Sequence, residues 1–287
     1  MKIADVFAKK KPILSFEIFP PKKAEALECI DETLGELCRL NPDFISVTFG
    51  AGGTAASNKT IELGRKIKDQ FGIEPLIHLT CLNYNKEEIL AILNRLRDEE
   101  LFNILALRGD VNPEAAVKDD FRYAKDLVAF ICEQGDEFSV SGACYPETHL
   151  EAESKVADIR HLKAKVDAGA THLVSQLFFE NELFYDFYEK TRIAGINVPI
   201  EAGIMPVTNK KQIERMVSLC GASLPVKFRR ILDRYEDKPQ ALFDAGMAYA
   251  INQIVDLIAA GVDGIHIYTM NKPIIAGRIY DGVHKLV

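Results

Sequence analysis

The stretch Asn103-Ile-Leu-Ala-Leu-Arg-Gly-Asp110 shows the design that decides the fold. Its apolar run is too short for a helix and passes directly into an arginine, a glycine and an aspartate, with Asn112-Pro113 closing the turn. The pattern predicts a buried strand that carries charged groups to a rim. Because the glycine has no Cβ, another group can approach the backbone closely. An isolated Arg-Gly-Asp would favour a pair on a surface turn, but the rest of the chain repeats the arrangement.

Eight apolar segments share this design, and we expect them to be strands: 13–19, 44–48, 75–80, 103–107, 138–143, 172–178, 199–204 and 264–268. Amphipathic stretches expected to be helices follow them: 22–40, 57–71, 86–99, 121–134, 152–168, 181–194, 209–219 and 240–260, with an extra helix at 226–235 and a last one after Lys272. Strand and helix alternate eight times, so we expect an α/β fold, a (β/α)8 TIM barrel that forms a single domain over residues 1–287.

An open doubly wound sheet is the alternative fold. It requires a glycine-rich turn after the first strand, where a dinucleotide would bind at a helix N-terminus. Here the first strand ends in Phe19-Pro20-Pro21-Lys22, which contains no glycine. Gly50-Ala-Gly-Gly53 follows the second strand but does not fit G-x-G-x-x-G, so we interpret it as a rim loop.

Composition excludes several classes of function. The 287 residues are 48% hydrophobic and carry a net charge of -7, so the chain has a full core and lacks the basic face that nucleic acid requires. We find no secretory signal and no long apolar segment, and we expect a cytoplasmic protein that does not contact a membrane. The six cysteines show no C-x-x-C spacing, so we expect free thiols, mostly buried, and no metal site among them.

Catalytic groups of such barrels lie at the C-terminal ends of different strands, so these ends are considered together. They carry Glu17, Thr48, His78 with Thr80, Arg108 with Asp110, Tyr145, and Gln176. Glu17 lies inside an apolar run, where an unpaired carboxylate is costly. It is either a structural ion pair with Lys22 or Arg108, or a carboxylic acid kept protonated by its surroundings, as a general acid requires.

The other strand-end groups also have structural explanations. His78 alternates with apolar neighbours and is equally well explained as a satisfied core histidine. Gln176 is a costly amide on a strand unless something pairs with it, whereas Thr48 is an ordinary strand residue. Glu147 and His149 lack a third nearby ligand, so a metal site there is disfavoured. Asp158, His161 and Lys165 share one helical face, which usually means a solvated face.

Taken in order, the strand-end segments closely resemble those of the methylenetetrahydrofolate reductase family, flavin-dependent barrel enzymes of one-carbon metabolism and methionine biosynthesis. The matching motifs span nearly the whole chain: Ser15-Phe-Glu-Ile-Phe-Pro-Pro21, Val47-Thr-Phe-Gly-Ala51, His78-Leu-Thr-Cys81, Leu107-Arg-Gly-Asp110, Ala143-Cys-Tyr-Pro-Glu147, Lys165-Val-Asp-Ala-Gly169, Gln176-Leu-Phe-Phe179 and His266-Ile-Tyr-Thr-Met-Asn271. Any one motif is weak, but eight in the family's order are highly specific.

The resemblance implies bound FAD, reduced by NADH or NADPH, which passes hydride to 5,10-methylenetetrahydrofolate to give 5-methyltetrahydrofolate in ping-pong kinetics. By analogy, Glu17 is the general acid that helps open the five-membered ring, and Asp110 lies beside the flavin and the pterin. The implied cofactor-binding residues are Thr48, His78, Arg108, Gly109, Asp110, Ala143, Tyr145, His149, Asp158, His161 and Lys165. The implied substrate-binding residues are Glu17, Gln176, Gln212, Met216 and Lys272.

The chain departs from the family pattern at four positions. His161 stands where bacterial relatives carry asparagine, and Ala164 where they carry arginine, which removes a fork for phosphate. Met216 replaces an aromatic residue, and Lys272 replaces an arginine near the folate glutamate.

Two other hypotheses therefore stay open beside the reductase. One is a flavin-binding electron-transfer subunit that a partner protein reduces, and the other is a pterin-binding barrel without flavin that transfers a group. We also expect a homo-oligomer.

Overall fold

The computed structural model describes residues 1–21, 26–49, 54–110 and 118–287, with side chains throughout these ranges except at 26–29 and 54–57. Three features discussed above lie outside the described residues: Lys22, the 50–53 loop, and the Asn112-Pro113 turn. The side chain of Cys29 is likewise outside them.

Eight parallel strands close into a barrel in sequence order, and β8 pairs with β1 through Ile13 and Gly264. The strands are β1 (Ile13–Ile18), β2 (Phe44–Val47), β3 (Glu74–Thr80), β4 (Asn103–Leu107), β5 (Ser139–Cys144), β6 (His172–Ser175), β7 (Ile200–Ile204) and β8 (Gly264–Tyr268). Each is rich in apolar residues that are buried on both faces, as parallel strands require. The expected α/β barrel is confirmed.

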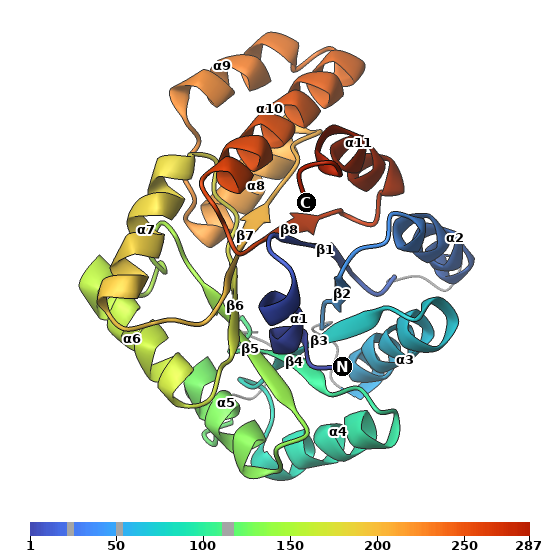
Figure 1. Ribbon diagram of the computed structural model, residues 1–287, viewed down its shortest axis with the longest axis vertical. Helices are drawn as coiled ribbons and strands as arrows, with labels where there is room; N and C mark the ends of the chain where they lie inside the picture. The colour runs from blue at the N-terminus through green and yellow to red at the C-terminus, as the bar shows by residue number, and fades with distance from the viewer. Residues whose placement is uncertain (22–25, 50–53, 111–117) are drawn as a thin grey trace.

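Helices form an outer ring around the strands (Figure 1). They are α2 (Ala26–Arg39), α3 (Thr54–Phe71), α4 (Lys86–Asp98), α5 (Ala124–Glu133), α6 (Lys155–Asp167), α7 (Asn181–Ile193), α8 (Lys210–Cys220), α9 (Val226–Tyr235), α10 (Pro239–Ala259) and α11 (Pro273–Val283). Side-chain caps begin several of them; Asn85, for example, forms a capping box with Glu88 at the start of α4. The helix ring buries its apolar stripes against the barrel, which gives the main core.

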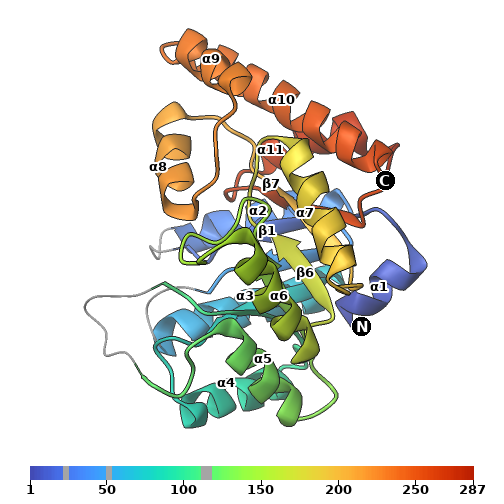
Figure 2. The same cartoon turned by 90° about the vertical axis from the view of Figure 1, so that its left-hand side faces the viewer.

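A further helix, α1 (Ile3–Lys9), closes one end of the barrel. It lies over the middle of the barrel in Figure 1, and Figure 2 shows it at the opposite end from α8. Ile3, Val6 and Phe7 are buried in a cluster with Ile13, Phe44, Leu76, Leu105 and Val174, which come from five strands. The sequence analysis missed this helix because seven residues span only two helical turns, too few to show a period.

The expected bounds of the sixth strand were wrong. The strand ends at Ser175 rather than at 178, and residues of β7 and β8 hydrogen-bond to Ser175. The Tyr268 hydroxyl donates to the Ser175 carbonyl at 2.8 Å, and the Gly203 amide donates to the Ser175 hydroxyl at 2.9 Å. The residues that follow turn outward, so Leu177 and Phe179 pack in a second cluster with α8 and α9.

The cysteines are free thiols where described, as expected, but they are not mostly buried. Cys81 and Cys144 are buried, Cys38 and Cys220 are half-buried, and Cys132 is exposed. No helix within the described ranges is both long and apolar enough to cross a membrane.

Candidate active site

Glu17, near the C-terminal end of β1, lies between two histidines. Its Oε2 is 3.6 Å from Nε2 of His78 on β3 and 3.6 Å from Nε2 of His266 on β8. The Glu17 side chain is 20% exposed, so it reaches both the barrel interior and the rim. The alternative explanation of Glu17 as the ion-pair partner of Arg108 is not borne out, because Arg108 forms a bidentate ion pair with Glu151, at 2.5 and 2.7 Å.

His78 is not the satisfied core histidine that its strand position allowed. The residue is buried, and its Nε2 has no hydrogen-bond partner among the described residues. Burial, with a smaller contribution from the neighbouring His266, lowers the pKa of His78 to about 4, although Glu17 acts in the opposite direction. A neutral ring with an unpaired nitrogen therefore faces the Glu17 carboxyl.

Gly109, just after the end of β4, has a left-handed backbone conformation. Its φ is +85°, and a Cβ at this position would lie 3.0 Å from the Cβ of Thr80 on β3. Both the backbone conformation and the lack of space require glycine. The half-buried Arg108 precedes this glycine, and the exposed Asp110 follows it.

Three predicted cofactor-binding residues come together after β5. The rings of Tyr145 and His149 meet edge to face at 4.7 Å, and the His149 amide donates to the Asp158 carboxylate at 3.0 Å. Burial raises the pKa of Tyr145 to about 12, so its hydroxyl stays protonated and can donate. Glu147 bonds elsewhere than to His149: its carboxylate accepts hydrogen bonds from the amide and the hydroxyl of Ser223.

Lys165 on α6 folds over the end of β5. Its ammonium donates to the Ala143 carbonyl at 2.6 Å, and its stem occupies the space where a Cβ of Gly142 would lie. Burial lowers the pKa of Lys165. The expected solvated helix face is thus wrong for Lys165 and for Asp158, which is half-buried, and holds for the exposed His161.

Gln176 and Thr48 are half-buried at the same end of the barrel. The Gln176 side-chain oxygen accepts from the Leu177 amide at 2.9 Å, which explains how an amide is tolerated there. The backbone amide of Thr48 donates a hydrogen bond to the Ile18 carbonyl, at the end of β1, at 3.0 Å.

The predicted substrate-binding residues of α8 line a second surface near the end of β7. Gln212 and Met216 share a shallow pocket with Met270, in which the other lining residues are Met205, Pro206, Val207, Thr208, Asn209 and Ile213. The surface combines apolar side chains with two side-chain amides, those of Asn209 and Gln212. Lys272 is exposed and is not among the residues of this pocket.

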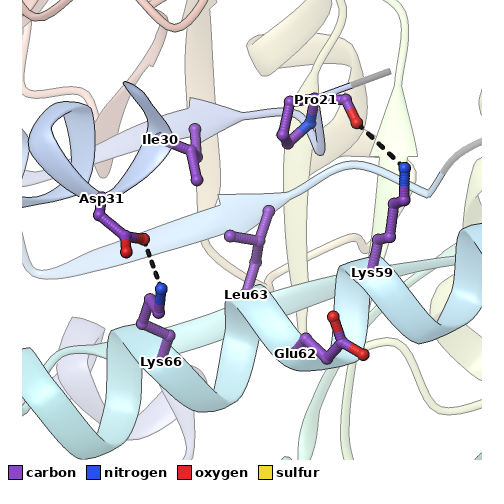
Figure 3. Close-up of a pocket in the computed structure, with 7 residues that line it drawn as sticks. All are labelled: Pro21, Ile30, Asp31, Lys59, Glu62, Leu63 and Lys66. Atoms are coloured by element: carbon purple, nitrogen blue, oxygen red, sulfur yellow. Dashed lines mark hydrogen bonds and ion pairs between the residues drawn. The ribbon is translucent and has the colours of Figure 1, made fainter. Parts of the chain in front are cut away.

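A larger cavity lies elsewhere. It has a volume of about 350 Å³ and lies between α2 and α3, on the outside of the barrel (Figure 3). The Lys66 ammonium is paired with Asp31 across it, and Lys59 donates to the Pro21 carbonyl at 3.4 Å. None of the candidate site residues lines it, so cavity size does not mark the site in this chain.

Four interior residues next to Glu17 were missed by the sequence analysis. Ser15, His172, Glu201 and His266 are buried inside the barrel and contact one another. The signal was present in Ile200-Glu-Ala-Gly-Ile204, where a carboxylate interrupts an apolar strand just as Glu17 does. These four residues lie in the layer of the barrel interior beneath the strand ends, and the sequence analysis considered only the strand ends. The described residues contain no group of three His, Cys, Asp or Glu side chains placed to hold a metal ion.

A model of the methylenetetrahydrofolate reductase family matches residues 2–284, nearly the whole chain. The chain belongs to this family. A protein of Escherichia coli named 5,10-methylenetetrahydrofolate reductase is 35% identical to it over 259 residues, which are 90% of this chain and 86% of that protein. The resemblance seen in the strand-end motifs is therefore confirmed.

Relatives from plants are longer. Methylenetetrahydrofolate reductase (NADH) 1 of Arabidopsis thaliana is 36% identical over 284 residues, which cover 94% of this chain but only 48% of the plant protein. Among solved structures, an uncharacterized protein from Clostridium thermocellum that binds two copies of 5-methyl-5,6,7,8-tetrahydrofolic acid aligns with a TM-score of 0.69 at 14% identity, over 100% of this chain and 99% of that one. At this identity the likeness shows the fold alone.

Proposed function

We propose that this chain reduces 5,10-methylenetetrahydrofolate to 5-methyltetrahydrofolate, with FAD as cofactor and NADH or NADPH as electron donor. The observation that carries the proposal is the position of Glu17, a carboxyl at the mouth of the barrel between two histidine rings. Family membership supports the reaction, and the named relatives are reductases of this folate.

Glu17 would supply the proton that opens the five-membered ring of the substrate. A general acid must hold a proton and present it to the reacting atom. For the first requirement, the mostly buried carboxyl lies next to a neutral His78, and the Arg108 cation pairs with Glu151 rather than with Glu17. Its 20% exposure at the rim suits the second.

The residues at the ends of β4 and β5 suit a flavin dinucleotide. Gly109, whose left-handed backbone follows β4 directly, would present its backbone to the flat ring, and the Tyr145 hydroxyl, which stays protonated, would donate to the cofactor. We also assign Arg108, which pairs with Glu151, and Lys165, which donates to the Ala143 carbonyl, to this cofactor. The other proposed contacts are Thr48, His78, Ala143, His149, Asp158 and His161. Bound FAD would accept hydride from the nicotinamide and deliver it to the folate.

The substrate would be held between Glu17 and the α8 surface. We assign Gln176 and Asp110 to the pterin, Gln212 and Met216 to flat rings that lie against the α8 surface, and Lys272 to the glutamate tail. Both the nicotinamide nucleotide and the folate would use this surface in turn, so ping-pong kinetics are expected. A single domain, a cytoplasmic location and a homo-oligomeric state stay predictions.

The test is an anaerobic visible spectrum of the purified protein with FAD, recorded before and after NADH and then methylenetetrahydrofolate are added. The proposal predicts a flavin band that NADH bleaches and the folate restores. A band that NADH and NADPH both fail to bleach would favour a partner protein as the electron donor. A protein that does not bind FAD would remove the flavin from the proposal and favour group transfer.

A further inference from the structure

A chain of buried polar groups runs through the barrel beneath Glu17. At its deep end, Glu201 on β7 and His172 on β6 form a pair with 2.9 Å between Oε2 and Nε2, and both side chains are 0% exposed. The other nitrogen of His172, Nδ1, lies 2.9 Å from the hydroxyl of Ser141. A charged group buried this completely costs stability unless its partners satisfy it.

Ser15 joins this pair to the site. Its hydroxyl oxygen lies 2.7 Å from Oε1 of Glu201 and 2.7 Å from Nδ1 of His266. On the other side of the same ring, Nε2 of His266 faces the Ser46 hydroxyl at 3.4 Å and Glu17 Oε2 at 3.6 Å. The imidazole of His266 therefore stands between the buried pair and the carboxyl proposed as the acid.

Helix α1 and its neighbours seal the deep end. The ring centroids of Phe7 and His172 are 4.8 Å apart. The centroid of the Phe44 ring is 6.0 Å from that of His172 and 6.3 Å from that of His266. With bulk water excluded on this side, the protein groups determine which hydrogen bonds form.

The single proton of the Ser15 hydroxyl fixes the direction of the chain. A carboxylate only accepts, so Ser15 donates to Glu201. Ser15 then has no proton for His266 and must accept from it, which requires the proton of the ring on Nδ1. In a neutral ring, Nε2 is then a lone-pair acceptor, and it is this nitrogen that faces Glu17.

We propose that Glu201, acting through Ser15, is a positioning residue that keeps the His266 proton on Nδ1, so that Nε2 faces the Glu17 carboxyl as an acceptor. His172 holds Glu201 in place by donating from Nε2. The separation of 3.6 Å between His266 and Glu17 shortens to a hydrogen bond by a small side-chain movement, as catalytic contacts commonly do when substrate binds. The role assigned to Glu17 rests on the proposed function, whereas the tautomer of His266 does not.

The tautomer is measured by NMR on protein labelled with ¹⁵N at histidine, using two-bond correlations between ring nitrogens and carbon-bound protons. The chain has six histidines, and the His266→Asn variant identifies the signals of residue 266. The proposal predicts a neutral ring with the proton on Nδ1 in the wild-type protein. A proton on Nε2 would overturn it.

Two variants test the connection. In Glu201→Leu, Ser15 is free to donate to Nδ1, so the proton should move to Nε2. In Ser15→Ala, a smaller change that leaves the Glu201–His172 pair intact, the preference for Nδ1 should be lost. Asp263→Asn is the matched control: Asp263 is also buried and comes immediately before β8, but it pairs with Lys11 and Arg192. An unchanged tautomer in the variants, or the same change in the control, would contradict the proposal.

The two half-reactions then separate this proposal from the proposed function. In the FAD-loaded enzyme, Ser15→Ala should slow folate reduction by roughly tenfold or more and leave reduction by NADH unchanged, because only the folate step uses the acid. Equal folate rates in the variant and the wild type would remove Ser15 and Glu201 from the reaction. A wild-type protein that does not reduce folate would instead refute the proposed function, and the NMR result would still decide the hydrogen-bond chain.

Discussion

His78 should make this protein lose stability as the pH falls from 7 to 5. In the native state burial lowers its pKa to about 4, whereas an unfolded histidine has a pKa of about 6.5. Between these values the unfolded chain binds a proton that the native ring does not, so the free energy of unfolding decreases as the solution is acidified.

The size of the effect follows from the two pKa values. The full difference between the native and the unfolded pKa corresponds to a loss of about 3 kcal/mol in the free energy of unfolding, which is complete below pH 4. About 2 kcal/mol of this loss occurs between pH 7 and pH 5. In His78→Asn the side chain is neutral at both pH values, so this part of the pH dependence should disappear. Other groups contribute equally to both proteins and cancel in the comparison.

The assay is urea unfolding at pH 7 and pH 5 at constant ionic strength, followed by fluorescence and circular dichroism. Coincident transitions are needed before a free energy is derived. His284 provides the control because its ring is exposed, and His284→Asn should retain the wild-type pH dependence. If His78→Asn lost as much stability on acidification as the wild type, the buried neutral ring next to Glu17 would be refuted.

Three further substitutions test the site and its support. Gly109→Ala should destabilise the protein by about 1 to 2 kcal/mol and weaken FAD retention, since φ is +85° and Thr80 occupies the space of the added Cβ. Thermal unfolding measures the first effect and flavin absorbance per protein the second, and unchanged values would contradict the proposed approach of the flavin to this backbone. Lys165→Met should also reduce flavin content while the far-UV circular dichroism stays native, because it removes the charge above Ala143; full flavin content would remove Lys165 from the cofactor site. Phe7→Ala should cost about 3 kcal/mol by opening the sealed end of the barrel, and a loss below 1 kcal/mol in urea unfolding would show that α1 is not a structural plug.

The barrel was predictable because its strands are short, apolar and ended by polar residues in a regular order. β4 and β8 were predicted with their observed bounds, and so was the extra helix α9. The end of β6 was not predicted; the contact that the last residue of this strand makes with Tyr268 joins residues 93 positions apart in the chain. Local sequence carries no signal for such a tertiary contact.

The candidate site divides in the same way. Strand ends could be read from the sequence because a barrel brings them to one rim, and this was enough to place Glu17 and Gly109. The partners of Glu17 could not be assigned, because choosing His266 rather than Arg108 depends on which residues of distant strands point into the same layer. The interior position of Glu201 was open to the same argument as Glu17, since each is a carboxylate within an apolar strand.

The measurement that tests the central claim most directly is the pair of half-reactions of Glu17→Gln, followed by stopped-flow absorbance of the flavin under anaerobic conditions. The account predicts that NADH reduces the flavin at the wild-type rate, whereas reoxidation by methylenetetrahydrofolate slows at least a hundredfold, because the amide cannot donate the required proton. Glu74→Gln, at the opposite end of the barrel on β3, is the control and should leave both rates unchanged. Reoxidation of Glu17→Gln by the folate at the wild-type rate would contradict the assignment of Glu17 as the acid.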